Sequence, residues 1–138
     1  MNRLNWKLIF ALSLFGIAMA LADTFGHIGK IEPILWLIIF VIYGVIIVRN
    51  APGNYFLHAF LVSVINGVWI GIIHASYHDT YMMNNPDMAN MESKMPMFGS
   101  PQMTMIILGP IFGALFGLIS GLITWIISKL MKKKTVAP

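Results

Sequence analysis

Residues 104–128 read TMIILGPIFGALFGLISGLITWIIS. No charged side chain interrupts this stretch, and a helix that crosses the hydrocarbon layer of a membrane needs roughly 20 apolar residues. Glycine recurs at every fourth position, at Gly109, Gly113, Gly117 and Gly121. These glycines share one helix face and let another backbone approach closely. The stretch therefore predicts a membrane-spanning helix that packs tightly through its glycines.

Three further apolar runs precede this helix, at about 5–22, 31–48 and 55–77. The chain is 58% hydrophobic and only 10% charged, whereas a soluble domain carries about 25% charged residues. Backbone groups find no hydrogen-bond partner in lipid, so each run must be helical. A short connection at 49–54 makes the second and third runs antiparallel neighbours. We expect an all-α integral membrane protein, a single domain over residues 1–138 that forms a four-transmembrane-helix antiparallel bundle.

The first run has a second interpretation. Arg3 and Lys7 precede an apolar stretch that ends Ala20-Leu21-Ala22, which is also the pattern of a secretory signal peptide with a cleavage site. A retained first helix gives an even number of crossings, which the charge distribution supports. We therefore expect a span, with cleavage as the alternative.

The charged residues separate between the two sides of the predicted bundle. Most basic residues flank one side, and all five acidic residues lie on the other, at Asp23, Glu32, Asp79, Asp87 and Glu92. Positively charged flanks stay in the cytoplasm. The sequence thus predicts a membrane protein with both termini in the cytoplasm and the loop 78–103 outside. The net charge of +4 then reflects anchoring beside anionic lipid, and no nucleic-acid partner is expected.

Glycine spacing also marks the third run, at Gly67 and Gly71. Two interpretations stay open for all six glycines. They either pack helices within one bundle or form a seam with other membrane helices or with a second copy of the chain.

Polar residues in the third run, His58, Ser63 and Asn66, lie inside the predicted span. A polar group in a span is costly unless it is paired, so we expect Asn66 to bond across to another helix. No carboxylate or basic residue lies in the interior of any predicted span, which argues against an ion-coupled transporter.

His74 and His78 are four residues apart and so share one helix face. This spacing can hold a metal, but such a site needs further ligands, and His27 and Asp23 lie on the correct side to provide one. The alternatives are hydrogen bonding to lipid phosphate or water, and a proton-linked role.

The outer loop contains MMNNPDMANMESKMPM at 82–97. Asn85 suits a helix N-cap, Pro86 suits the first helical position, and Pro96 ends the run. Between them, methionine recurs with helical spacing, at Met88, Met91 and Met95. We expect a short amphipathic helix that lies in the membrane interface.

The same methionines have a metal-binding interpretation, because thioether sulfur suits Cu(I). The candidate ligands are His74, His78, Met88, Met91, Met95 and Met97. By combining methionine motifs with glycine-packed spans, the chain resembles the eukaryotic-type copper transporters. Those proteins have three spans and an intramembrane MxxxM that this chain lacks.

Three segments, NAPG (50–53), NPDM (85–88) and GPIFGALFGLISGLITWIISKLMKKK (109–134), resemble a family of small four-span bacterial inner-membrane proteins of unknown function. The resemblance implies the architecture and carries no activity or binding site.

No GxSxG, HExxH or cysteine nucleophile occurs, so no enzyme and no cofactor are expected. We predict a non-enzymatic accessory or assembly component that packs against other membrane helices and lipids. The first alternative is a copper or soft-metal protein. The second is a small pore or lipid-substrate transporter, which predicts a groove beside Ser63, Asn66 and His74.

Overall fold

The protein was analysed as a computed structural model, which describes residues 4–96 and 98–135, without the side chains of 133–135. Every regular element in the described ranges is helical. The elements are α1 (Trp6–Thr24), the 3-10 turn η1 (Gly29–Ile31), α2 (Glu32–Asn50), α3 (Tyr55–Ser76), α4 (His78–Asn84), α5 (Pro86–Lys94) and α6 (Pro101–Thr135).

Four of these segments are long and apolar enough to cross a membrane, namely Trp6–Thr24, Gly29–Asn50, Tyr55–Ser76 and Pro101–Lys132. The predicted all-helical class, with four helices long and apolar enough to span a membrane, is thereby confirmed. The last helix starts earlier and ends later than the predicted 104–128.

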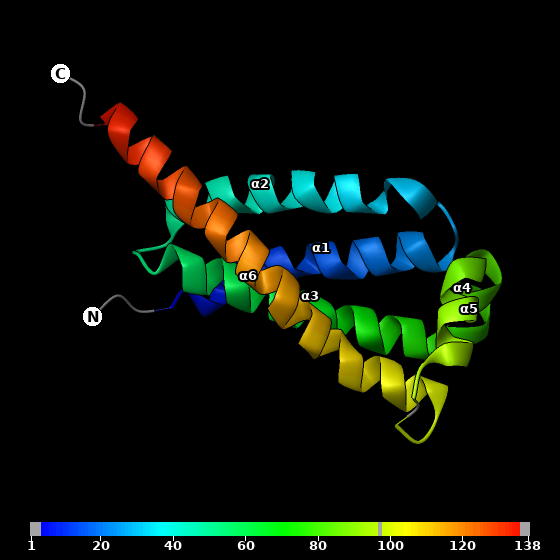
Figure 1. The fold of residues 1–138 in the computed structure, drawn as a ribbon. Helices are drawn as coiled ribbons and strands as arrows, with labels where there is room; N and C mark the ends of the chain where they lie inside the picture. The colour runs from blue at the N-terminus through cyan, green and yellow to red at the C-terminus, as the bar shows by residue number, and fades with distance from the viewer. Residues whose placement is uncertain (1–3, 97, 136–138) are drawn as a thin grey trace.

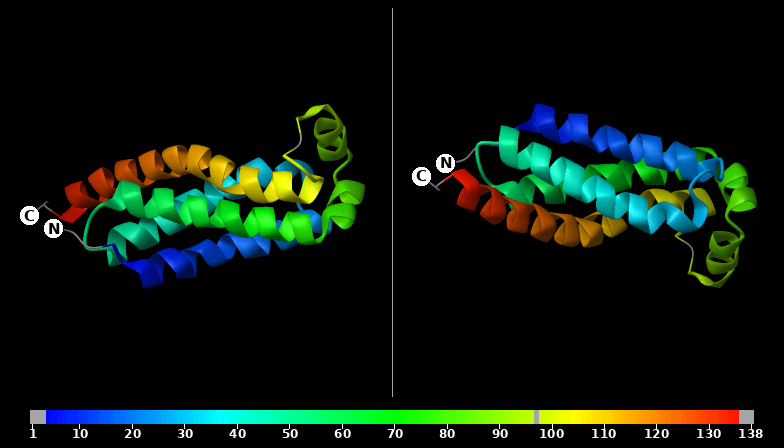
Figure 2. Two further views of the ribbon diagram at one scale, coloured as in Figure 1. Left: turned by 90° about the horizontal axis from the view of Figure 1, so that it is seen from below. Right: turned by 90° about the horizontal axis from the view of Figure 1, so that it is seen from above.

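The helices α1, α2 and α3 run side by side, and α6 crosses them obliquely (Figure 1). The most extensive contacts join α3 to α6, followed by those of α1 with α3 and of α2 with α6. The start of α1 and the end of α6 lie at one end of the bundle, while α4 and α5 lie at the other (Figure 2). We call the latter the α5 end.

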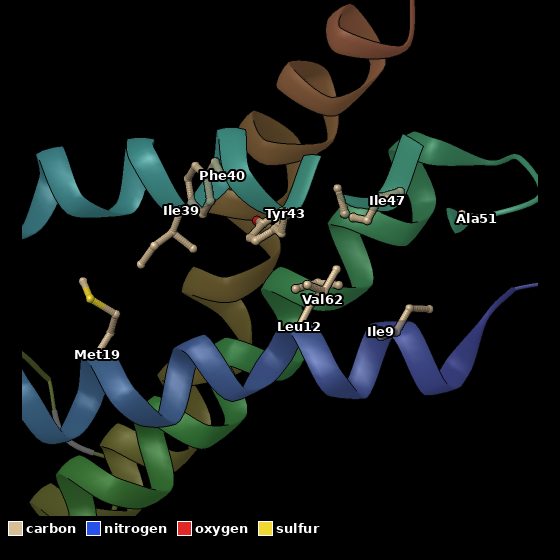
Figure 3. Packing of buried hydrophobic residues seen from close by; sticks show 10 residues of the cluster. Ile9, Leu12, Met19, Ile39, Phe40, Tyr43, Ile47, Ala51 and Val62 are labelled. Atoms are coloured by element: carbon tan, nitrogen blue, oxygen red, sulfur yellow. The ribbon is translucent and has the colours of Figure 1, made fainter. Parts of the chain in front are cut away.

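The apolar core lies between α1, α2 and α3 (Figure 3). Its most buried members are Ile9, Tyr43, Ile47, Ala59 and Val62, none of which is exposed. Large apolar side chains also cover the outward faces of α2 and α6, for example Ile34, Leu115 and Leu122. Such a surface suits lipid, which needs no polar cover.

Three hydrogen bonds tie α1 and the residue before it to α3. The backbone N–H of Gly16 donates to Asn66 Oδ1 at 3.1 Å, so Asn66 reaches a neighbouring helix as expected. Trp69 Nε1 donates to Ser13 Oγ at 3.2 Å. The N–H of Asn5 donates to His58 Nε2 at 2.9 Å. The first helix is therefore an integral part of the bundle.

The glycines of α6 pack against α3. A Cβ at Gly67 would collide with the carbonyl oxygen of Gly109, and a Cβ at Gly113 would lie 2.7 Å from the carbonyl oxygen of Ser63. Gly71 meets the backbone of α6 in the same way, and Gly117 and Gly121 face the rings of Phe60 and Phe56. The glycine face expected to contact other membrane helices is thus covered by α3, because the two backbones approach closely there.

The outer loop forms two short helices. The expected helix is present as α5, and Asn85 is its N-cap residue, but the Asn85 side chain makes no capping hydrogen bond. Its Nδ2 donates instead to the carbonyl oxygens of Asp23 and Tyr81. The preceding helix α4 was not expected, since seven residues are too few to form a stable helix alone. Contacts with α1, including the bond from Asn84 Nδ2 to the carbonyl oxygen of Thr24, hold it in place.

Candidate functional site

A cavity of about 680 Å³ lies between α2, α3 and α6, beneath α4 and α5. This is the size range of small-molecule pockets in proteins. It forms because α6 lies against α2 near Gly44, where Thr124 and Ile127 contact it, and separates from α2 toward the α5 end (Figure 1). The long walls are apolar and rich in aromatic side chains, including Trp36, Phe40, Phe112 and Phe116.

Polar side chains gather where the cavity meets the α5 end. Asp23 and His74 lie in the last turns of α1 and α3, Glu32 begins α2 and Tyr81 belongs to α4, and all four line the cavity. Asp23 and His74 are only 3% and 8% exposed. His74 Nε2 lies 3.5 Å from Asp23 Oδ2, and this buried nitrogen has no hydrogen-bond partner. A buried polar atom of this kind lacks a partner that a ligand can supply.

Tyr81 lies over these groups. Its ring stacks on the His74 imidazole, with ring centroids 3.8 Å apart. Burial raises the pKa of Tyr81 well above the usual value for tyrosine, and the negative charges of Asp23 and Glu32 add to this shift. The phenol therefore stays protonated and available as a hydrogen-bond donor.

Ser63 and Asn66 line the cavity deeper in the bundle. The Oδ1 atom of Asn66 accepts the Gly16 bond, but its Nδ2 is buried and has no partner. An unsatisfied buried donor costs about 1–3 kcal/mol. The groove predicted beside Ser63, Asn66 and His74 therefore exists, and a hydrogen-bond donor in its wall lacks an acceptor.

Helix α5 borders the cavity through Met88 and Met91, and Met95, directly after the helix, also belongs to the lining. His78 holds this helix to α4. Its Nε2 lies 2.9 Å from Glu92 Oε2, and its Nδ1 lies 3.2 Å from Asp79 Oδ1. Burial alone would lower the pKa of His78, but the hydrogen bonds and charges of Glu92 and Asp79 outweigh it and raise this pKa.

The predicted metal ligands are only partly brought together. His74 and the three α5 methionines line one cavity, whereas His78 is not among the lining residues. Met97 lies outside the described residues. Within the described ranges, no group of three or more histidines and carboxylates is placed to hold a metal ion. The copper interpretation stays a prediction.

His58 belongs to a different part of the bundle, in the first turn of α3. Its Nδ1 lies 2.9 Å from the carbonyl oxygen of Asn54, while its Nε2 accepts from the backbone N–H of Asn5. A carbonyl only accepts and an N–H only donates, so the ring is neutral with its proton on Nδ1. This histidine fastens the chain before α1 to α3 and lies away from the cavity.

The sequence did not single out Glu32, Trp36 or Tyr81 as site residues. One signal was available, because Asp23, Glu32 and His74 each lie at the α5 end of a predicted span and so at a similar depth. Comparison with known protein families, curated proteins and solved structures gives no match. Function must therefore be inferred from the residues of the chain itself.

Proposed function

We propose that this chain is a non-enzymatic, multi-pass protein of a bacterial cytoplasmic membrane that binds a lipid-like amphiphile in the cavity between α2, α3 and α6. Both termini face the cytoplasm and α5 faces the outside. The segregation of basic and acidic residues supports this orientation. The observation that carries the proposal is a cavity with apolar walls and a polar end, set among helices that suit a membrane.

The lateral side of the cavity supports entry from the bilayer. Leu37 on α2 and Phe112 and Phe116 on α6 line the cavity, yet they are 53%, 49% and 51% exposed. Residues that both line a cavity and remain exposed mark its opening. This opening lies between two helices whose outward faces suit lipid, so a molecule dissolved in the membrane can reach it without crossing water.

The distribution of polarity along the cavity fits an amphiphile. The hydrocarbon part would lie against Phe40, Leu108 and Phe112, and the polar part against Asp23, His74 and Tyr81. Burial of apolar surface contributes about 25 cal/mol per Å², so the hydrocarbon tail of the ligand would supply most of the affinity. The accessory role predicted from the sequence would use the glycine face of α6, which α3 covers, and the outer methionine segment, whose Met88, Met91 and Met95 line the cavity. We therefore give the cavity precedence over that role.

Native mass spectrometry of the protein extracted in mild detergent tests this function. The wild type should carry an amphiphile in a one-to-one complex. Leu108→Trp fills the cavity and should reduce the bound fraction about tenfold, equivalent to about 1.4 kcal/mol. Leu122→Trp is the matched control, since Leu122 is 52% exposed on the same helix and is not part of the lining. Equal occupancy in both variants, or an empty wild type, would refute the proposal.

A second candidate, soft-metal binding, is favoured by one observation. His74 and the thioethers of Met88, Met91 and Met95 line the same cavity, and His74 Nε2 has no hydrogen-bond partner. Titration with Cu(I) or Ag(I) against a competing chelator tests it. Replacing the three methionines with leucine should weaken binding about tenfold or more while keeping an apolar wall. An unchanged affinity would exclude these methionines as ligands.

A further inference from the structure

The charge at the polar end of the cavity bears on which head group it can accept. The described residues that line the cavity include Asp23, Glu32 and Glu92 but no lysine or arginine. Glu92 already pairs with His78. The unbalanced groups are therefore Asp23 and Glu32, which face the cavity from α1 and α2.

Neither of these carboxylates pairs with a lysine or an arginine in the described part of the chain. His74 Nε2 lies 3.5 Å from Asp23 Oδ2, beyond the usual range of an N–H···O bond. Glu32 Oε1 accepts one hydrogen bond, from Trp36 Nε1 at 3.2 Å. A buried carboxylate without a cation is costly, so both groups would gain from a positive charge placed between them.

A second observation, independent of the carboxylates, also indicates a missing ligand at this point. His74 is 8% exposed, its ring is held by stacking on Tyr81, and its Nε2 has no hydrogen-bond partner. The cavity is therefore bounded here by a polar atom that the protein itself leaves unsatisfied. In the tautomer that carries its proton on Nδ1, the lone pair of Nε2 would accept a hydrogen bond from a ligand N–H.

Aromatic rings complete the surroundings. Trp36, which donates to Glu32, and Phe40 line the cavity with ring centroids 5.8 Å apart, and Tyr81 is also part of the lining. The faces of such rings attract alkylammonium groups through cation–π interactions. An anionic head group would instead meet two carboxylates at close range and be repelled.

Resting on the proposed function, we propose that the α5 end of the cavity selects amphiphiles with a cationic amine head group, held between Asp23 and Glu32 against Trp36 and His74. The hydrocarbon chain supplies affinity, and the carboxylates supply the choice of head group. A neutral amphiphile of the same chain length would bind through its chain alone.

Competition among three probes of equal chain length tests this selection. Dodecylamine, dodecanol and laurate are added at equal mole fraction to the protein in maltoside micelles at pH 8, and occupancy is read by native mass spectrometry. The wild type should favour dodecylamine over each of the others by about tenfold. The double variant Asp23→Asn/Glu32→Gln should lose this preference while still binding dodecanol.

The matched control is Asp87→Asn, which removes one negative charge from α5 outside the cavity lining and should keep the preference, whereas Glu32→Gln removes one negative charge from the lining and should reduce it. If the double variant does not purify as a monodisperse protein, the comparison of these two single variants decides the test. Equal binding of all three probes by the wild type would overturn the selection and leave the proposed function standing. Failure of every probe to bind would overturn both.

Discussion

The imidazole of His74 and the phenol ring of Tyr81 stack with centroids 3.8 Å apart and planes 17° from parallel. This contact joins the last turn of α3 to α4 and forms part of the cavity wall. Because α4 is too short to be stable alone, the stack and the asparagine bonds to α1 determine where the outer helices lie.

Loss of this stack should loosen the outer helices. We expect Tyr81→Leu to cost about 0.5–1.5 kcal/mol beyond the change in buried area and to speed amide hydrogen exchange in 78–94. Tyr81→Phe keeps the ring and is the control, with exchange close to that of the wild type. Similar exchange in the leucine variant and the wild type would show that other contacts hold α4.

The contact between His78 and Glu92 makes the docking of α5 depend on pH. The pKa of His78 is raised when α5 is docked, so its stabilising contribution is fully present below the ordinary histidine pKa of about 6.5. The contribution is lost as the pH rises through the raised value. Once the intrinsic pH dependence of amide hydrogen exchange is corrected for, amide exchange in α5 should therefore be slower at about pH 6 than at about pH 9. Glu92→Gln should flatten this dependence, and a steep dependence in that variant would assign it to other groups.

The glycine contacts between α3 and α6 should stabilise the single chain. Gly113→Ala places a Cβ 2.7 Å from the carbonyl oxygen of Ser63, and such overpacking costs about 1–3 kcal/mol. Unfolding in mixed micelles measures this loss. Leu118→Ala, on an exposed part of α6, is the control and should change stability little. A change in oligomeric size with unchanged stability would instead favour a seam between chains.

Replacing His58 should detach the start of α1 from α3. His58→Leu removes both ring nitrogens and leaves the N–H of Asn5 unpaired, which costs about 1–3 kcal/mol. The imidazole is fully buried, so the loss should appear in the free energy of unfolding. His27→Leu, at an exposed position, is the comparison and should be neutral. Amphiphile occupancy should persist in folded His58→Leu protein, because His58 does not line the cavity.

Local patterns predicted the elements whose formation depends on local chemistry. The four long helices follow from uninterrupted apolar runs, since hydrocarbon leaves the backbone no other partner. Pro86 and Pro96 delimited α5. Helix α4 escaped prediction because its bonds come from residues about 60 positions away, such as the carbonyl oxygen of Thr24.

The candidate site was predicted only in part. Ser63, Asn66 and His74 were expected beside a groove, and they line the cavity. Asp23 was considered as a further metal ligand, and Glu32 only as one of the acidic residues on the outer side. The structure brings both to the cavity because α1, α2 and α3 each have one end at the same level of the bundle. Trp36 was not singled out because an aromatic residue at the end of a span more often anchors it in the interface. Tyr81 belongs to the outer loop and reaches the cavity only because α4 forms.

By itself, the sequence determined the helical class, the four spans and the glycine spacing of α6, because each depends on residue type and period alone. The tertiary structure decided which helix the glycines meet and the direction in which α6 leaves α2. That direction depends on how two surfaces fit together, and the period of one helix does not specify its partner. The cavity exists because α6 packs closely on α3. The half of α6 nearer the α5 end therefore lies away from α2.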